Sequence, residues 1–180
     1  MRRAAIIFLS ILTVQAVDIT SLIKAYKNKN YALVCKKGYK LFDKLRKDEN
    51  LLTMYAFSCL KIDYIDRLAV PILILGKTPQ SRNNRAYFSL ILAQKNILTA
   101  ALFDGIKFKD LNIPQTDYVL SKVFNLYFQK KYKKTDNRYI MQDPVTNIKY
   151  EMNVLRRNRS EKLLSIKEIR PNKTIIHYYR

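Results

Sequence analysis

The chain has 180 residues and a formal net charge of +20, from 34 Lys and Arg against 14 Asp and Glu. This length suits one domain, or a domain with a small appendage, and the excess of positive charge favours anionic partners. A single histidine, three glycines and scattered carboxylates argue against a catalytic triad, a glycine-rich phosphate loop or a metal site, so we expect a protein that is not an enzyme and holds no cofactor.

The N-terminus has the three-part plan of a secretory signal peptide. Arg2 and Arg3 precede an apolar run over residues 4–14, and Ala16 closes a segment that suits signal-peptidase cleavage. The run is shorter than the about 20 apolar residues that a membrane span needs. We therefore expect loss of residues 1–16 and a mature chain without an integral membrane span, in the periplasm or another extracytoplasmic space. The alternative is an uncleaved N-terminal anchor.

Cys35 and Cys59 are the only two cysteines. In an oxidising compartment such a pair forms a disulfide that stabilises a fold by roughly 3 kcal/mol in the chain-entropy model. The alternative is two buried free thiols on adjacent helices. With no histidine nearby, the pair does not predict a zinc site.

A faint repeat of 33 residues runs through the first part of the chain. Lys29-Asn30-Tyr31 recurs as Ile62-Asp63-Tyr64 and again as Lys95-Asn96-Ile97, each time between segments with helical apolar spacing. Asn or Asp before an apolar run is a common helix N-cap. The pattern predicts three helix–turn–helix hairpins across residues 18–105, with a non-repetitive helical bundle as the alternative.

The period, together with Ala25-Tyr26 and Tyr31-Ala32 around the first turn, resembles the tetratricopeptide family of helical repeats. This resemblance implies a helical-repeat domain within residues 17–134 whose concave groove serves as a protein-binding scaffold. Pro71 departs from the family pattern, because it interrupts the second helix of the middle hairpin. Gly38 lies inside a helix, where it costs about 1 kcal/mol against Ala unless two helices must pack closely.

The end of the chain changes from helical periodicity to alternation. Thr116 and Asp117 are expected to cap a last helix, whose apolar stripe is Leu120, Val123, Phe124, Tyr127 and Phe128. From there, alternating apolar residues predict strands near 138–142, 147–156, 162–169 and 174–179. The predicted fold class is therefore α+β, with residues 135–180 forming a basic antiparallel sheet of two hairpins that packs on the last helix.

Two basic features are candidate partner-binding sites. Lys36, Lys40 and Lys44 are expected to form one stripe on the second helix. In the tail, basic and aromatic residues are interspersed, as is typical of interfaces with proteins or with nucleic acid. Export argues against nucleic acid. The tail candidates are Arg156, Arg157, Arg159, Tyr178 and Tyr179.

These features together predict an exported, non-enzymatic scaffold protein of the cell envelope. Its helical groove and basic tail would bind an envelope protein, expected to be acidic. The alternative is an electrostatic binder of envelope polyanions, meaning anionic lipid, phosphorylated glycan or nucleic acid. The two hypotheses differ in salt dependence, because binding driven by charge alone weakens steeply as salt rises.

Overall fold

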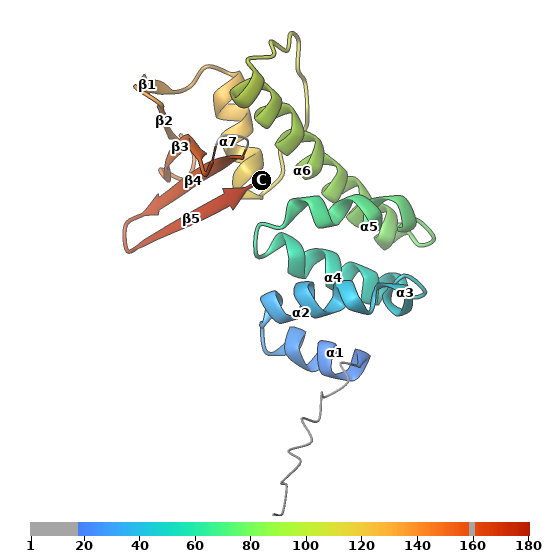
Figure 1. Ribbon diagram of the computed structural model, residues 1–180. Helices are drawn as coiled ribbons and strands as arrows, with labels where there is room; N and C mark the ends of the chain where they lie inside the picture. The colour runs from blue at the N-terminus through green and yellow to red at the C-terminus, as the bar shows by residue number, and fades with distance from the viewer. Residues whose placement is uncertain (1–17, 159–160) are drawn as a thin grey trace, which may run out of the picture.

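The computed structural model describes residues 18–158 and 161–180 and confirms the α+β class (Figure 1). The predicted signal peptide, residues 1–16, lies outside the described residues. The helices are α1 (Ile19–Lys27), α2 (Tyr31–Lys40), α3 (Phe42–Leu45), α4 (Glu49–Leu60), the 3-10 helix η1 (Ile65–Leu68), α5 (Ala69–Ile74), α6 (Pro79–Asp104) and α7 (Val119–Phe128). The strands are β1 (Lys133–Thr135), β2 (Arg138–Gln142), β3 (Lys149–Arg156), β4 (Lys162–Arg170) and β5 (Lys173–Tyr179).

The first predicted hairpin is formed by α1 and α2. Its turn contains Lys29, whose φ of 58° lies in the left-handed region. The side chain of Asn30 then accepts a hydrogen bond from the backbone N–H of Leu33 at 3.2 Å. Asn30 is therefore the helix N-cap that the sequence predicts.

The middle hairpin turns at Asp63 and has an irregular second arm. Asp63 has a φ of 64°, and the backbone N–H of Tyr64 donates to the carbonyl of Cys59 at 2.9 Å, which closes the end of α4. The second arm is η1 followed by the short α5, not one long helix. Pro71 lies in the first turn of α5, where a missing N–H costs no intrahelical hydrogen bond.

The prediction of a third hairpin is wrong. α6 runs without a break through the expected turn at residues 95–97. Neither Gly nor Pro occurs between Pro79 and Gly105, and the buried Phe88, Ile91 and Leu98 keep helical spacing across the expected turn. One Asn inside so long an apolar stripe costs too little to break the helix.

By length and composition, α6 is long and apolar enough to cross a membrane, and it is the one such helix among the described residues. The core helix of a soluble protein passes the same test. In this fold α6 packs against η1, α5 and α7, and it buries the polar Gln94 and Lys95 together with its apolar residues.

The loop between α6 and α7 differs in detail from the expected cap. α7 begins after Tyr118, whose backbone N–H donates to Oγ1 of Thr116 at 3.3 Å. Asp117 does not cap the helix, because its Oδ1 accepts a hydrogen bond from the hydroxyl of Tyr87 on α6 at 2.7 Å. Thr116 therefore supports the start of α7, whereas Asp117 ties the loop to α6.

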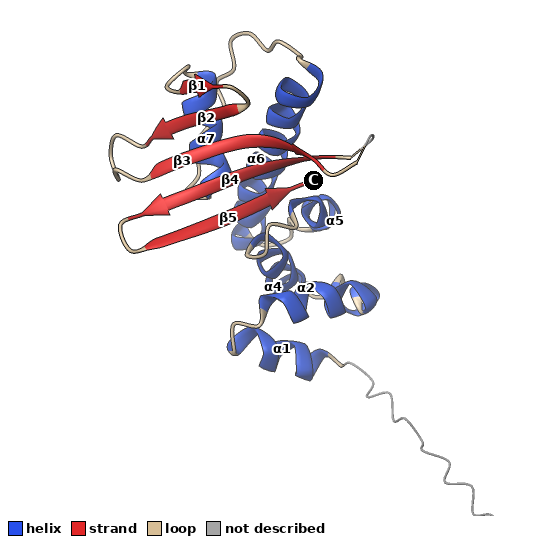
Figure 2. Cartoon of the chain, turned by 60° about the vertical axis from the view of Figure 1, so that its left-hand side comes forward, coloured by secondary structure: helices blue, strands red, loops and turns tan. Residues whose placement is uncertain are grey.

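The five strands form an antiparallel meander in the order β1-β2-β3-β4-β5. The structure confirms the four predicted strands and adds β1, whose three residues are all exposed and therefore carry no alternation signal. One face of the sheet lies over α6 and α7, and the other is open (Figure 2). The buried residues of the covered face include Met141, Tyr150, Met152, Leu164 and Ile166, and they join the buried helical residues in one core.

Candidate functional site

The helical part and the sheet meet at a partly buried pair of polar side chains, Asp63 and His177. Asp63 lies in the turn after α4, and His177 lies on β5, 114 positions further along the chain. Nδ1 of His177 is 3.0 Å from both carboxylate oxygens of Asp63. The side chain of His177 is only 15% exposed, so this contact joins the turn to the sheet in a partly desolvated setting.

Three further side chains complete this contact. The hydroxyl of Tyr118 donates to Oδ1 of Asp63 at 2.7 Å. On the other side of the ring, Nε2 of His177 is 3.7 Å from Oε2 of Glu168. Glu168 is buried, and its Oε1 accepts hydrogen bonds from the guanidinium of Arg170 at 2.8 and 3.1 Å.

The environment of His177 favours its protonated form. Burial lowers the pKa of the imidazole, but the hydrogen bond to Asp63 and the charges of Asp63 and Glu168 outweigh burial and raise the pKa above its usual value. Burial, followed by the charge of Asp63, raises the pKa of the Tyr118 hydroxyl. This hydroxyl therefore stays protonated and donates its hydrogen bond to Asp63. His177, placed between two carboxylates, is a structural cross-link between the two parts of the fold.

The geometry does not resemble a nucleophilic catalytic site. Asp63 occupies one ring nitrogen of His177, and the other nitrogen is buried and faces Glu168. A general base needs one ring nitrogen free to face a nucleophile or a substrate. Within residues 18–158 and 161–180, no group of three His, Cys, Asp or Glu side chains has metal-binding geometry.

Beside this cross-link lies an open cleft of about 470 Å³, which we call the junction cleft. One wall is the turn and η1, and the other is the end of the sheet. Its lining residues are Asp63, Tyr64, Ile65, Asp66 and Arg67 from the turn and η1, Lys95 from α6, and Leu163, Tyr178, Tyr179 and Arg180 from the sheet and C-terminus.

Two exposed tyrosines and a partly buried arginine line the junction cleft. Tyr64 is 56% exposed and Tyr178 is 49% exposed, one on each wall. The guanidinium of Arg67 lies 3.8 Å from the ring centre of Tyr39, and its Nη1 is buried without a hydrogen-bond partner among the described residues. Tyr and Arg are the residues most enriched at the energetic centres of protein interfaces.

The acidic side chains of the junction cleft are already paired. Nζ of Lys95 is 2.7 Å from Oδ1 of Asp66, and the lysine side chain is 9% exposed. Asp63 is held by His177 and Tyr118, as described above. Arg180, by contrast, is 68% exposed and has only a long 3.9 Å contact with Glu161. The cleft therefore offers unneutralised positive charge.

The structure separates the residues that the sequence placed together in the last strand. Tyr178 is exposed on the rim of the junction cleft, whereas Tyr179 is 0% exposed and its ring lies against that of Tyr118. Successive strand residues point to opposite faces, so only one of the two could face a partner. Tyr179 is therefore a core residue, and we withdraw it as a partner contact.

The other predicted binding residues that the structure describes are exposed but dispersed. Lys36 and Lys40 lie on α2, which ends at Lys40, whereas Lys44 lies on the separate α3, so the expected single stripe is broken at Leu41. Arg156 and Arg157 are exposed at and just beyond the end of β3, and Arg157 pairs with Glu161 at 3.6 Å. Arg159 lies outside the described residues.

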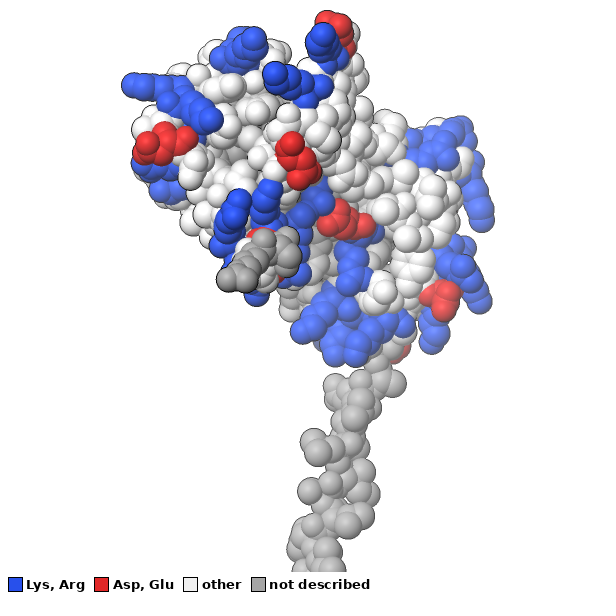
Figure 3. All heavy atoms as spheres, turned by 45° about the horizontal axis from the view of Figure 1, so that its top comes forward, with Lys and Arg blue, Asp and Glu red and all other residues white. Residues whose placement is uncertain are grey.

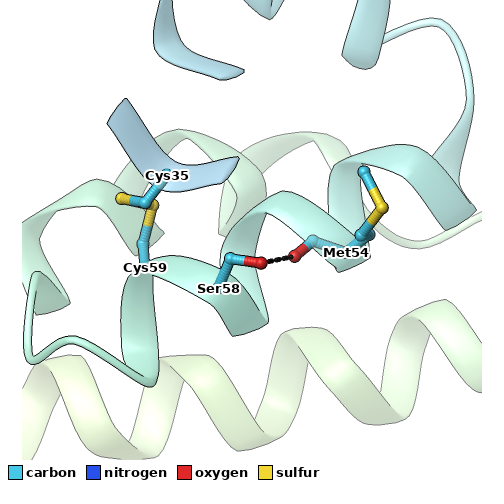
Figure 4. The surroundings of a disulfide bond; sticks show 4 residues. All are labelled: Cys35, Met54, Ser58 and Cys59. Carbon is cyan, nitrogen blue, oxygen red and sulfur yellow. Dashed lines mark hydrogen bonds between the residues drawn. A yellow bond between two sulfur atoms is a disulfide. The ribbon is translucent and has the colours of Figure 1, made fainter. Parts of the chain in front are cut away.

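Cys35 and Cys59 form a disulfide between α2 and α4 (Figure 4). Both residues are buried, at 2% and 0% exposure, within the core of the helical part. Of the two alternatives, the structure has the bridge and not the free thiols. The bridge holds the first hairpin onto α4, which is followed by the turn that contains Asp63.

Comparison of the chain with protein-family models, curated proteins and solved structures finds no match. The resemblance of α1 and α2 to a tetratricopeptide hairpin therefore stays a prediction. Sequence reasoning missed Asp63, Arg67, Lys95 and Arg180 as cleft residues. The only signal for Asp63 was its place in the repeat at the second turn, and no local pattern connects the other three.

Proposed function

We propose that the protein is an exported, non-enzymatic binding protein of the cell envelope, whose junction cleft holds a segment of an acidic partner protein. The observation that carries this proposal is the composition of the cleft. Exposed Tyr64 and Tyr178 face it from the two walls, while its carboxylates are engaged by neighbouring residues. An acidic segment would find aromatic surface and unneutralised guanidinium groups there.

The helical part supports the same function in a different way. α1, α2 and α4 pack in a stack in which a disulfide joins α2 to α4, and α4 leads directly into the turn that lines the cleft. Proteins of the tetratricopeptide family present such stacked hairpins as scaffolds, and the resemblance of the first hairpin extends this role to the present chain as part of the proposal. Rigid walls reduce the ordering cost of binding, because less conformational entropy is lost.

The purified protein should retain a discrete acidic protein from an extract of its own cell envelope, through a wash at high salt. The paired substitutions Tyr64→Ser and Tyr178→Ser should weaken this binding at least about 30-fold, since a hot-spot residue contributes about 2 kcal/mol. Val145→Ser is the matched control, because Val145 is 88% exposed in the turn between β2 and β3 at the far end of the sheet.

Two results would contradict the proposal. The first is recovery of lipid, glycan or nucleic acid alone, all released at high salt, which would favour the polyanion hypothesis. The second is a partner that binds the Tyr64→Ser/Tyr178→Ser protein as well as it binds the wild type, which would place the interface elsewhere.

A further inference from the structure

A second hollow lies at the same end of β4 as the junction cleft, but on the side of β3 and the β1–β2 hairpin, and we call it the basic pocket. Its volume is about 580 Å³. It lies between the last turn of α6 and the end of the sheet. Its lining residues are Leu102 and Phe103 of α6, Lys134, Asn137 and Tyr139 of the β1–β2 hairpin, and Val154, Arg156 and Lys162 of β3 and β4.

The strand register directs three cations into this pocket. Lys134 pairs with Tyr139 across β1 and β2, and Arg156 pairs with Lys162 across β3 and β4. Paired residues share a face of the sheet, and Tyr139 pairs with the buried Met152. Lys134, Arg156 and Lys162 therefore all lie on the helix-covered face, at the end where that cover stops.

The charge of the basic pocket is not compensated by acidic residues. None of its lining residues is Asp or Glu. In the part of the chain that the structure describes, Lys134, Arg156 and Lys162 form no ion pair. Figure 3 shows that Lys and Arg also predominate on the surface it displays. Three like charges in one hollow repel each other, and a bound anion would relieve this repulsion.

Neighbouring groups hold two of the cations in position. Nζ of Lys162 donates a hydrogen bond to the carbonyl of Phe103 in the last turn of α6. Nζ of Lys134 lies 5.4 Å from the ring centre of Tyr139, over its face. An ammonium group has three donors, so Lys162 keeps two for a ligand after its bond to Phe103. The pocket is thus partly organised before any ligand binds.

We propose that the basic pocket binds a phosphoryl group, carried either by a soluble phosphorylated sugar or by the headgroup of an anionic lipid. The guanidinium of Arg156 matches two phosphoryl oxygens at once, and the two lysines supply point charges around it. The pocket volume leaves room for the sugar or glycerol that carries the phosphoryl group. This site is separate from the junction cleft and does not rest on its proposed function.

Inorganic pyrophosphate is the first probe, and calorimetric titration of the full protein at low salt is the measurement. The wild type should bind, and Arg156→Gln and Lys134→Gln should each weaken binding about tenfold, since one charge-assisted hydrogen bond contributes about 1.5 kcal/mol. Arg138→Gln is the matched control. Arg138 pairs with Asn153, so it lies on the opposite face of the same end of the sheet, and this variant should bind as the wild type does.

Vesicles of phosphatidylcholine with phosphatidic acid distinguish the two sources. Co-sedimentation that Arg156→Gln abolishes and Arg138→Gln retains would identify a lipid headgroup, whereas pyrophosphate binding without co-sedimentation would identify a soluble ligand. The proposal is overturned if the wild type binds neither probe, or if Arg138→Gln weakens binding as much as Arg156→Gln. Substitution of Tyr64 and Tyr178 should leave pyrophosphate binding unchanged, which keeps this test independent of the junction cleft.

Discussion

His177 is the residue on which the joining of sheet and helices depends most directly. Its ring lies between Asp63, from the turn after α4, and Glu168, from β4. The pKa of His177 is raised in the folded chain, because two carboxylates stabilise its charged form. Folding therefore favours proton binding at this site, and stability becomes dependent on pH.

We predict that the protein loses stability as pH rises above about 6.5, through the raised pKa of His177. A raised folded pKa contributes stability that is complete below the unfolded pKa of about 6.5 and disappears as pH rises through the folded pKa. His177→Gln should remove this pH dependence and lower the free energy of unfolding at pH 6 by about 2 kcal/mol, because it leaves two carboxylates without their cation. Urea unfolding between pH 5.5 and 8.5 measures both effects.

Ile176→Gln is the control for this experiment, since Ile176 is the neighbouring residue on the open face of β5. It should keep the pH dependence of the wild type. A His177→Gln protein with an unchanged slope of stability against pH would show that His177 does not carry the cross-link.

The carboxyl group of Glu49 is the source of a second dependence of stability on pH, in the acidic range. It accepts backbone hydrogen bonds from Gly76 at 2.7 Å and Lys77 at 2.9 Å, and so holds the start of α6 against α4. The hydrogen bond from Lys77 is the largest influence on this carboxyl; burial opposes it, but with the bonds from Ser81 and Gly76 the pKa falls to about 2. The stabilisation is present above about pH 4.5 and is lost as pH falls towards 2.

Glu49→Gln should therefore be less stable than the wild type at neutral pH, and the difference should shrink as the pH falls from 4.5 to 2. Thermal unfolding followed by circular dichroism across this range tests the prediction. Asp43→Asn is a suitable control, because the side chain of Asp43 is 90% exposed and pairs only with Arg46 on the surface. A constant difference between Glu49→Gln and wild type down to pH 2 would contradict the assignment.

At the scale of the helices, close packing explains the glycine inside α2. A Cβ atom on Gly38 would lie 2.7 Å from Cδ2 of Tyr55 and 3.2 Å from Cδ1 of Leu45. Tyr55 is a buried ring on α4 and cannot move aside easily. The requirement for close contact between α2 and α4 therefore outweighs the poor helix propensity of glycine.

Gly38→Ala is predicted to destabilise the protein by about 1–3 kcal/mol, the usual cost of overpacking. Helix propensity alone predicts the opposite result, an increase of about 1 kcal/mol in the free energy of unfolding. Chemical denaturation distinguishes the two. An increase in the midpoint of unfolding would mean that α2 and α4 are less closely packed than the structure indicates.

The disulfide gives a further prediction for the same two helices. The combined substitution Cys35→Ser and Cys59→Ser should lower the free energy of unfolding by about 3 kcal/mol, because the bridge restricts the unfolded chain over a sequence separation of 24. Protein purified from an oxidising compartment should resist alkylation of these cysteines until it is reduced and unfolded. Alkylation without prior reduction, detected by mass spectrometry, would contradict the bridge.

The accuracy of sequence reasoning differs between elements for physical reasons. Asn30 and Asn96 occupy the same place in the 33-residue repeat, yet Asn30 caps α2 and Asn96 lies within α6. The first follows a left-handed Lys29, which ends the preceding helix, whereas the second lies within an unbroken apolar stripe. The local cap signal was the same at both sites, and only the wider stripe distinguishes them.

The candidate site was harder to predict than the strands. β3 alternates in polarity, and residues 143–147 and 170–173 have the composition of turns, so local pattern was enough to locate strands β2 to β5. The contact of Asp63 with His177 joins positions 114 apart, and no local pattern encodes it. Alternation could still have shown that Tyr178 and Tyr179 face opposite sides, and thus that only one is available to a partner.

At the scale of the whole molecule, one core extends from the first helices to the last strand. Leu22 of α1 and Tyr179 of β5 belong to the same connected set of buried residues. The helical part and the sheet should therefore unfold as one cooperative unit, with the junction cleft held between them. This arrangement gives the cleft two fixed walls, which is what binding of a partner segment requires.

The most direct test of partner binding is photo-crosslinking from the junction cleft in living cells. A benzoylphenylalanine placed at position 178 should yield a discrete cross-linked protein, and one placed at the exposed position 145 should not. The product from position 178 should persist when cells are irradiated at raised salt and should disappear when Tyr64→Ser is added. The same products from both positions, or none from position 178, would contradict the junction cleft as a binding site.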